Sequence, residues 1–323
     1  MMHIFQNVIE PTFLALVVFC IAYVLGVLTF KTFGWDRLKG VSVLGAGLQA
    51  IVGYGVLGTI VLLLSLLGPI TLGTAVMLVI VLLLVGRTHT VSLLRQWKSL
   101  LRAQKKEHWF NKLLLALILL GVIFYATSAF VPAYRNDAIS YHIPEVVEIA
   151  TQGFSLEARP GQFFFNIFIL METMYVLGYV FGGGTVAHLM HFGLALSFLA
   201  VLFSFTSHVY SKRAGLCASL FALSLYEFWV NATNSYVDAA TSAFEITAVC
   251  LLVFWVMHKE HRLLQSIGLL LGFAAASKYN GLYGVLLFGL IFLFTFIREK
   301  ISMKEFMRRT LYVYILFLVC AGN

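Results

Sequence analysis

The residues best suited to chemistry lie in one polar stretch, residues 132–181, of a chain that is otherwise strongly apolar. Asp137 offers a carboxylate that can accept a proton, and Arg135 and Arg159 offer guanidinium groups that can bind an anion. Tyr141 and His142 add further hydrogen-bonding groups beside Asp137. Two simpler interpretations are a solvated loop in which Asp137 caps a turn, and an interfacial aromatic pair formed by Tyr141 and His142.

Lone ionisable residues also occur at two other turns, as Asp238 and Lys278. Thr241 and Glu245 follow Asp238 at helical spacing, so we expect this helix face to point into a bundle. Glu227 and Glu245 are functional candidates if they lie inside a membrane, with a neutral structural carboxyl as the alternative. Lys278 can instead extend its charge to the membrane interface.

Composition places these residues in a membrane protein. The 323 residues are 61% hydrophobic and 11% charged, with a mean hydropathy of +0.93, whereas soluble domains carry about 25% charged residues. Apolar runs of the ~20 residues that a helix needs to cross a bilayer recur along the chain. We therefore expect an all-α, polytopic helix bundle. The net charge of +8 comes from basic residues in short loops, which indicates orientation and no nucleic-acid partner.

The threading depends on residues 162–181. If this segment crosses the membrane, the 22 Lys and Arg residues divide 11 to 11; if it does not, they divide 19 to 3. The positive-inside rule favours the second threading. It predicts about ten membrane segments and one re-entrant or juxtamembrane helix, with the N-terminus outside and the basic loops cytoplasmic, in a multi-pass plasma (inner) membrane protein. The ten segments are expected to begin near Pro11, Val41, Thr71, Leu113, Thr185, Ala214, Asp238, Leu263, Leu282 and Thr310.

The outer stretch should contain a short surface helix. Pro144 suits the first position of a helix, Glu145 suits its positive end, and Gly153 can terminate it. Asp137 would then lie on the approach to this helix, just after a membrane segment.

At these residues the sequence resembles a known class. The run Asp-Ala-Ile-Ser-Tyr-His-Ile-Pro at 137–144 is similar to the first-loop motif of bacterial GT-C membrane glycosyltransferases, which include protein O-mannosyltransferases and the lipid A aminoarabinose transferase (glycosyltransferase family 39-like). Arg159-Pro160, Asp238 and the glycine-to-lysine run 272–278 follow in the family's order. The resemblance covers residues 113–296.

The resemblance implies transfer of a sugar from a polyprenyl-phosphate-linked donor to a lipid, glycan or protein acceptor at the outer face, with inversion. Asp137 would be the base, and Arg159 and Lys278 would stabilise the departing phosphate. Asp238 would either orient one of these cations or help to bind a divalent metal, for which Asp137 is another possible ligand. Substrate-binding residues would be Arg135, Tyr141, His142, Arg159, Asp238 and Lys278. The sugar and the acceptor are not identified.

The resemblance also divides the chain into an N-terminal three-helix membrane segment with a basic loop, residues 1–112, and a catalytic membrane core, residues 113–323. Residues 310–323 supply 14 positions where a crossing needs ~20, so we expect a C-terminally incomplete core. Two rivals remain: a transporter or lipid flippase using Glu227, Asp238 and Glu245, and an assembly subunit without chemistry.

Overall fold

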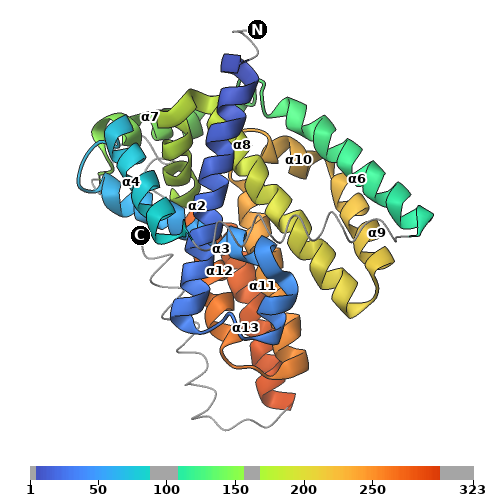
Figure 1. Ribbon diagram of the computed structural model, residues 1–323. Coiled ribbons are helices and arrows are strands. Elements are labelled where there is room, and N and C mark those ends of the chain that lie inside the picture. The colour runs from blue at the N-terminus through green and yellow to red at the C-terminus, as the bar shows by residue number, and fades with distance from the viewer. Residues whose placement is uncertain (1–4, 88–107, 156–167, 299–323) are drawn as a thin grey trace.

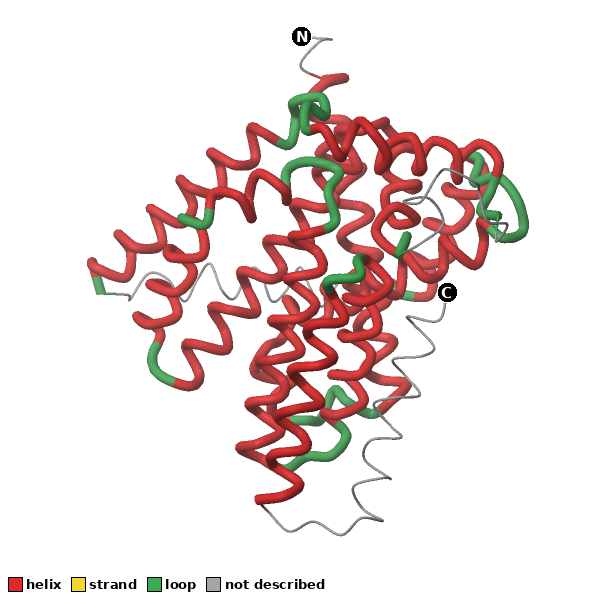
Figure 2. The backbone as a smooth tube through the Cα atoms, turned by 180° about the vertical axis from the view of Figure 1, so that it is seen from behind, coloured by secondary structure: helices red, strands yellow, loops and turns green. Residues whose placement is uncertain are grey.

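A computed structural model describes residues 5–87, 108–155 and 168–298, and all regular elements in these ranges are helices. Figures 1 and 2 show them as a bundle with one group of helices splayed to the side. Five helices are long and apolar enough to cross a bilayer. These spans are Phe5–Phe33 (η1 with α2, Glu10–Phe33), α3 (Lys39–Ser65), α6 (Trp109–Ser128), α8 (Leu170–Val209) and α11 (Asp238–His258).

The remaining apolar helices are short. α4 (Leu72–Val85) has 14 residues, which span ~21 Å of a hydrocarbon layer ~30 Å thick. α12 (Leu263–Ser277) and α13 (Gly281–Arg298) are also shorter apolar helices. α9 (Lys212–Leu223) and α10 (Tyr226–Ala232) are bent by 74° and would together make a sixth span. An all-helical membrane fold is confirmed, whereas the expected count of about ten spans is not.

Glycines let α2 and α3 approach closely. A Cβ atom at Gly53 would lie 1.6 Å from the Ala22 carbonyl oxygen, and one at Gly26 would lie 1.7 Å from the Gln49 carbonyl oxygen. Small residues are common at helix interfaces in membranes because van der Waals packing between backbones replaces the hydrophobic effect there. α2 and α3 also pack against α8, so this pair of helices supports α8.

α8 reverses direction near Gly182 and Gly183, which have non-helical backbone angles. Gly183 has a positive φ of 69°, a conformation that glycine adopts without steric cost. A Cβ atom at Gly178 would lie 2.8 Å from the Cα atom of Ala187, although nine residues of straight helix would separate them by ~13 Å. Residues 170–181 and 184–209 are therefore the two arms of a helical hairpin.

The hairpin bears on the segment expected to be re-entrant, residues 162–181. Residues 162–167 lie outside the described part of the chain, and the rest forms the first arm from Leu170 onward. Because this arm turns back at its end, its shape suits a re-entrant segment. Its position relative to a membrane stays a prediction.

The short helix after Asp137 forms as expected. A π-helical turn, η3 (Ala138–His142), leads into α7 (Ile143–Gln152). Pro144 lies within the first two positions, Glu145 lies in the first turn, and Gly153 ends the helix with a φ of 83°.

Two of the loops expected on the cytoplasmic side, α2–α3 and α11–α12, lie together. In Figure 1 the start of α2 and α7 are at the top, while the α2–α3 and α11–α12 connections are lower. These two connections touch, because Trp35 Nε1 donates to Gln265 Oε1 at 3.0 Å and the Lys39 amide donates to Glu260 Oε2 at 3.3 Å.

Candidate functional site

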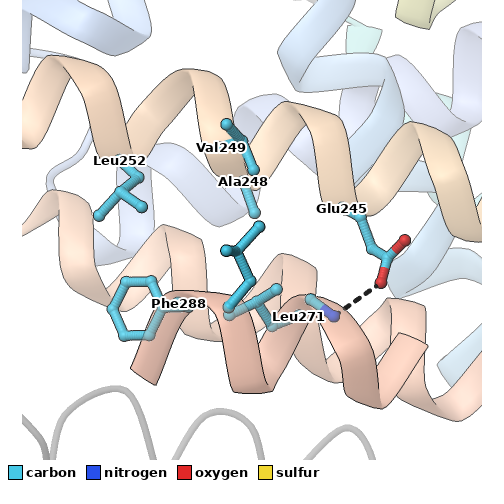
Figure 3. A pocket seen from close by; sticks show the side chains of 8 residues that line it. Glu245, Ala248, Val249, Leu252, Leu271 and Phe288 are labelled. Carbon is cyan, nitrogen blue, oxygen red and sulfur yellow. Dashed lines mark hydrogen bonds between the residues drawn. The ribbon is translucent and has the colours of Figure 1, made fainter. Parts of the chain in front are cut away.

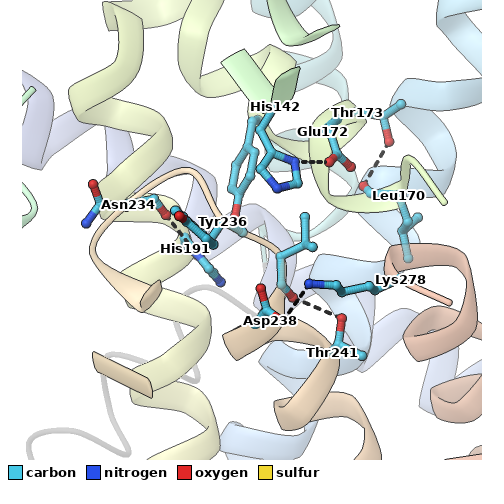
Figure 4. A network of polar contacts seen from close by, with 12 residues as sticks. His142, Leu170, Glu172, Thr173, His191, Asn234, Tyr236, Asp238, Thr241 and Lys278 are labelled. Atoms are coloured by element: carbon cyan, nitrogen blue, oxygen red, sulfur yellow. Dashed lines mark hydrogen bonds and ion pairs between the residues drawn. The ribbon is translucent and has the colours of Figure 1, made fainter. Parts of the chain in front are cut away.

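Asp238 and Lys278 meet where α11 begins and α12 ends. These helices pack against each other and are joined by a short loop at their other ends, so the first residue of α11 lies beside the residue after α12. Lys278 Nζ is 2.7 Å from Asp238 Oδ1, with the side chains 23% and 36% exposed. Figure 4 shows this pair facing the same space as His142 and Tyr236. The two lone charges of the sequence thus form one half-buried ion pair.

A second pair lies deeper. His142 Nδ1 is 2.5 Å from Glu172 Oε1, and the two side chains are only 4% and 5% exposed. A carboxylate at Nδ1 favours the tautomer with hydrogen on that nitrogen, which leaves Nε2 as an acceptor. His142 Nε2 and Glu172 Oε2 are buried and have no hydrogen-bond partner among the described residues. His142 was predicted from the sequence, and Glu172 was missed.

The segment before α11 is hydrogen-bonded to both arms of the α8 hairpin. Tyr175 donates its hydroxyl hydrogen to the Tyr236 carbonyl, and His191 Nδ1 is 2.9 Å from the Asn234 carbonyl oxygen. Tyr175 and His191 lie on opposite arms of the α8 hairpin, with their rings 5.6 Å apart. The hairpin therefore positions the start of α11, a role that the sequence did not reveal.

Asp137 lies beside two tyrosines of the same cluster. Burial raises the pKa of Tyr141, and the carboxylate of Asp137, to which the phenol is hydrogen-bonded, raises it further. Burial also raises the pKa of Tyr236, with a second contribution from the Asp137 charge. Both phenols remain protonated at neutral pH and can donate hydrogen bonds. The structure thus brings Asp137, Tyr141, His142, Asp238 and Lys278 into one neighbourhood.

Arg135 and Arg159 are the remaining predicted site residues. Arg135 Nη2 lies 3.2 Å from Glu227 Oε2, with the side chains 31% and 71% exposed. Pairs as exposed as this contribute little to stability, below about 1 kcal/mol. Glu227 is thus an exposed partner of Arg135 and does not lie inside the helix bundle. Arg159 lies outside the described residues.

Glu245 is separate from this cluster. Its Oε1 atom accepts a hydrogen bond from the Gly284 amide at 3.0 Å, which joins α11 to α13 (Figure 3). The adjoining cavity of about 10 Å³ is lined mostly by apolar side chains, and a space of this size admits about one water molecule. This geometry matches the structural, hydrogen-bonded carboxyl that was the alternative for Glu245.

For a metal, the part of the chain that the structure describes contains no group of three or more His, Cys, Asp or Glu residues able to hold an ion. The Asp238 carboxylate is instead paired with Lys278. Of the two roles open to Asp238, orienting a cation fits this geometry better, and metal binding remains a separate prediction.

Fold and site together define an α-helical membrane protein with a cluster of paired ionisable residues at one end of α11 and α12. Among known families, a model described as a domain of unknown function, DUF8201, matches residues 12–154. This match includes Asp137, Tyr141 and His142 and crosses the expected domain boundary at residue 112. No curated protein and no solved structure matches the chain.

Proposed function

We propose that this chain is a GT-C-like glycosyltransferase that moves a sugar from a polyprenyl-phosphate-linked donor to an acceptor at the outer face of a plasma (inner) membrane. The observation that carries the proposal is the Lys278–Asp238 pair, 2.7 Å apart, in the same neighbourhood as Asp137. This arrangement offers a carboxylate for the attacking group and a cation for the leaving group. Both are requirements of transfer from a phosphate-linked sugar.

In the proposed reaction, the acceptor hydroxyl oxygen forms a bond to the anomeric carbon while the bond from that carbon to the phosphate oxygen breaks. The electron pair of the broken bond leaves with the phosphate, and Asp137 accepts the hydroxyl proton. Attack opposite the leaving group inverts the anomeric centre.

Lys278 would stabilise the negative charge that grows on the phosphate, and Asp238 would hold the ammonium group in position. Arg159 is proposed to share this role with Lys278. Tyr141 would donate a hydrogen bond to Asp137 or to substrate, and His142 Nε2 would accept one from a substrate hydroxyl.

The proposed topology has about ten membrane segments, with α4, α12, α13, the bent α9–α10 pair and residues 310–323 completing the five longer spans. The hairpin arm 170–181 would be re-entrant from the outer face. This threading puts Asp137, Asp238 and Lys278 on the outer side, and it assigns 19 of the 22 basic residues to the cytoplasm.

The experiment is turnover of a panel of radiolabelled polyprenyl-phosphate sugars by membranes containing the full chain. Asp137→Asn removes the proton acceptor while keeping the side-chain shape, so turnover should fall by about 100-fold or more, the usual worth of general-base catalysis. The matched control is Asp36→Asn, an exposed aspartate in the α2–α3 loop. Equal turnover by the Asp137 and Asp36 variants, at equal protein levels, would contradict the proposed role.

A further inference from the structure

The buried pair of His142 and Glu172 leaves two polar atoms that the described residues do not satisfy. His142 Nδ1 and Glu172 Oε1 bind each other at 2.5 Å, and both side chains are almost fully buried. The second polar atom of each group, His142 Nε2 or Glu172 Oε2, is buried and has no hydrogen-bond partner among the described residues. Buried polar atoms are nearly always paired, and a half-satisfied polar network is costly. The two orphaned atoms therefore indicate a ligand group that completes the pair.

Packed helices hold both side chains of this pair. His142 ends the η3 turn, which leads directly into α7, and α7 packs against α8. Glu172 lies in the first turn of α8. The next residue, Thr173, donates its hydroxyl hydrogen to the Gly58 carbonyl of α3 at 3.1 Å. The carboxylate is thus fixed to the helical scaffold, and its bond to Nδ1 holds the imidazole ring in one orientation.

The pair lies at the candidate site. Figure 4 shows the His142 ring facing the same space as Asp238. Burial raises the pKa of the Tyr141 phenol, and the charge of Asp137 raises it further. Glu172 and Asp238 make smaller contributions of the same sign. The three carboxylates are therefore within electrostatic range of one phenol, and the orphaned atoms belong to the neighbourhood of the proposed base.

Both orphaned atoms are hydrogen-bond acceptors. The carboxylate places the imidazole hydrogen on Nδ1, so Nε2 of the neutral ring carries none, and an ionised carboxylate can only accept. The group that completes the pair must therefore be a donor. In the proposed reaction Asp137 takes the hydroxyl of the acceptor, so the remaining donors are the other hydroxyl groups of the sugar.

We propose that His142 Nε2 accepts a hydrogen bond from a ring hydroxyl of the transferred sugar, and that Glu172 is the positioning residue that keeps this nitrogen free of hydrogen. This inference rests on the proposed sugar transfer and adds a determinant of sugar specificity to it. A site that binds a substrate hydroxyl strongly rejects an analogue without it, because the buried polar group of the protein is then left unpaired. The pair would thus select a sugar by one hydroxyl position.

The test compares the donor that the wild-type chain uses best with its deoxyfluoro analogues, in each of which fluorine replaces one ring hydroxyl and cannot donate. We expect kcat/KM to fall by about tenfold or more at one ring position. Each hydroxyl-to-fluorine ratio is measured on one protein sample, so a loss of folded protein cancels. The electronic effect of fluorine is common to all variants, so the change in the ratio between variants reports the contact.

Two variants should lower that ratio at the same ring position by about tenfold. Glu172→Gln can present its amide hydrogens to Nδ1, which favours hydrogen on Nε2. His142→Asn removes Nε2 but keeps an amide beside Glu172, so a pair with only a structural role would leave the ratio unchanged. Glu10→Gln, at an exposed carboxyl that begins α2, is the matched control and should keep the wild-type ratio.

A second measurement needs no turnover. Nitrogen NMR spectra of the wild-type chain with isotope-labelled histidines, assigned with His142→Asn, report which ring nitrogen of His142 carries hydrogen. We expect Nδ1–H and no hydrogen on Nε2 at neutral pH. Hydrogen on Nε2, no discriminated ring position, or ratios unchanged by both variants would overturn this inference and leave the proposed transfer standing. Absence of turnover with every donor would overturn the proposed transfer, and this inference with it.

Discussion

At the scale of residues, two ion pairs in the described part of the chain are withdrawn from water, one half-buried and one almost fully buried. A charge in apolar surroundings is costly unless a partner compensates it, and Lys278–Asp238 and His142–Glu172 each meet this condition. The sequence could single out Asp238 and Lys278 because each is a lone charge between apolar segments. It could not pair them, because they are 40 residues apart and only the packing of α11 on α12 unites them.

Glu172 was overlooked because the sequence was divided into apolar segments without considering single ionisable residues inside them. It lies in the apolar run 162–181, so an ionisable residue at that position was a usable signal. Its partner, His142, is 30 residues away on another element, and the contact forms because α7, which follows His142, packs against α8.

This buried pair gives a prediction about stability. Glu172→Ala leaves the N–H group at His142 Nδ1 buried without its partner, so we expect a loss of about 1–3 kcal/mol in unfolding free energy. Glu227→Ala breaks the exposed pair with Arg135 and should cost less than about 1 kcal/mol. Thermal unfolding of the purified variants in detergent compares the two, and similar midpoints for both variants would contradict the assigned burial.

At the scale of elements, hydropathy predicted where several helices begin, but it did not predict where helices bend or reverse. The expected starts near Pro11, Val41, Asp238, Leu263 and Leu282 fall within two residues of observed helix starts. The reversal at Gly183 and the 74° bend between α9 and α10 depend on backbone geometry, which apolar content does not encode. A run of three glycines at 182–184 was the available local signal for the reversal.

The glycines between α2 and α3 allow a sharp test of that packing. Gly53→Ala would place a methyl group against the Ala22 carbonyl, so the two helices must move apart. The unfolding free energy should fall by an amount at the upper end of the roughly 1–3 kcal/mol that overpacking costs. Gly289→Ala in α13 is the matched control, because a Cβ atom there meets nothing within 4 Å. The control should be neutral or stabilising by about 0.5 kcal/mol. Both effects can be read from melting midpoints; equal midpoints would mean that α2 and α3 are farther apart.

At the scale of the whole molecule, the account rests on which ends of the helices face outward. The α2–α3 and α11–α12 connections touch each other, as expected of two loops on one side. The Asp238–Lys278 pair lies at the opposite ends of α11 and α12, a separation of ~30 Å along a 21-residue helix. Charge counting predicted that these two connections share a side, and their contact agrees with this; which side of a membrane they face stays a prediction. How the short helices pack into the bundle could not be predicted without the three-dimensional structure.

Cysteine labelling tests this arrangement in a chain whose four native cysteines are replaced. A membrane-impermeant maleimide should label Gly184→Cys, at the hairpin turn, in intact cells. It should label Tyr210→Cys, an exposed position before α9, only after permeabilisation. The reverse pattern would show that residues 162–181 cross the membrane. The start of α9 would then lie on the same side of the membrane as Asp137, contrary to the proposed topology.

The most direct test of sugar transfer uses the wild-type chain in proteoliposomes with donors that carry one label on the sugar and another on the polyprenyl phosphate. Transfer predicts that the labels separate: the sugar joins an acceptor supplied as membrane extract with inverted anomeric configuration, and free polyprenyl phosphate accumulates in equal amount. Intact donor from every sugar tested, moved from one leaflet to the other, would contradict the account and identify a flippase instead.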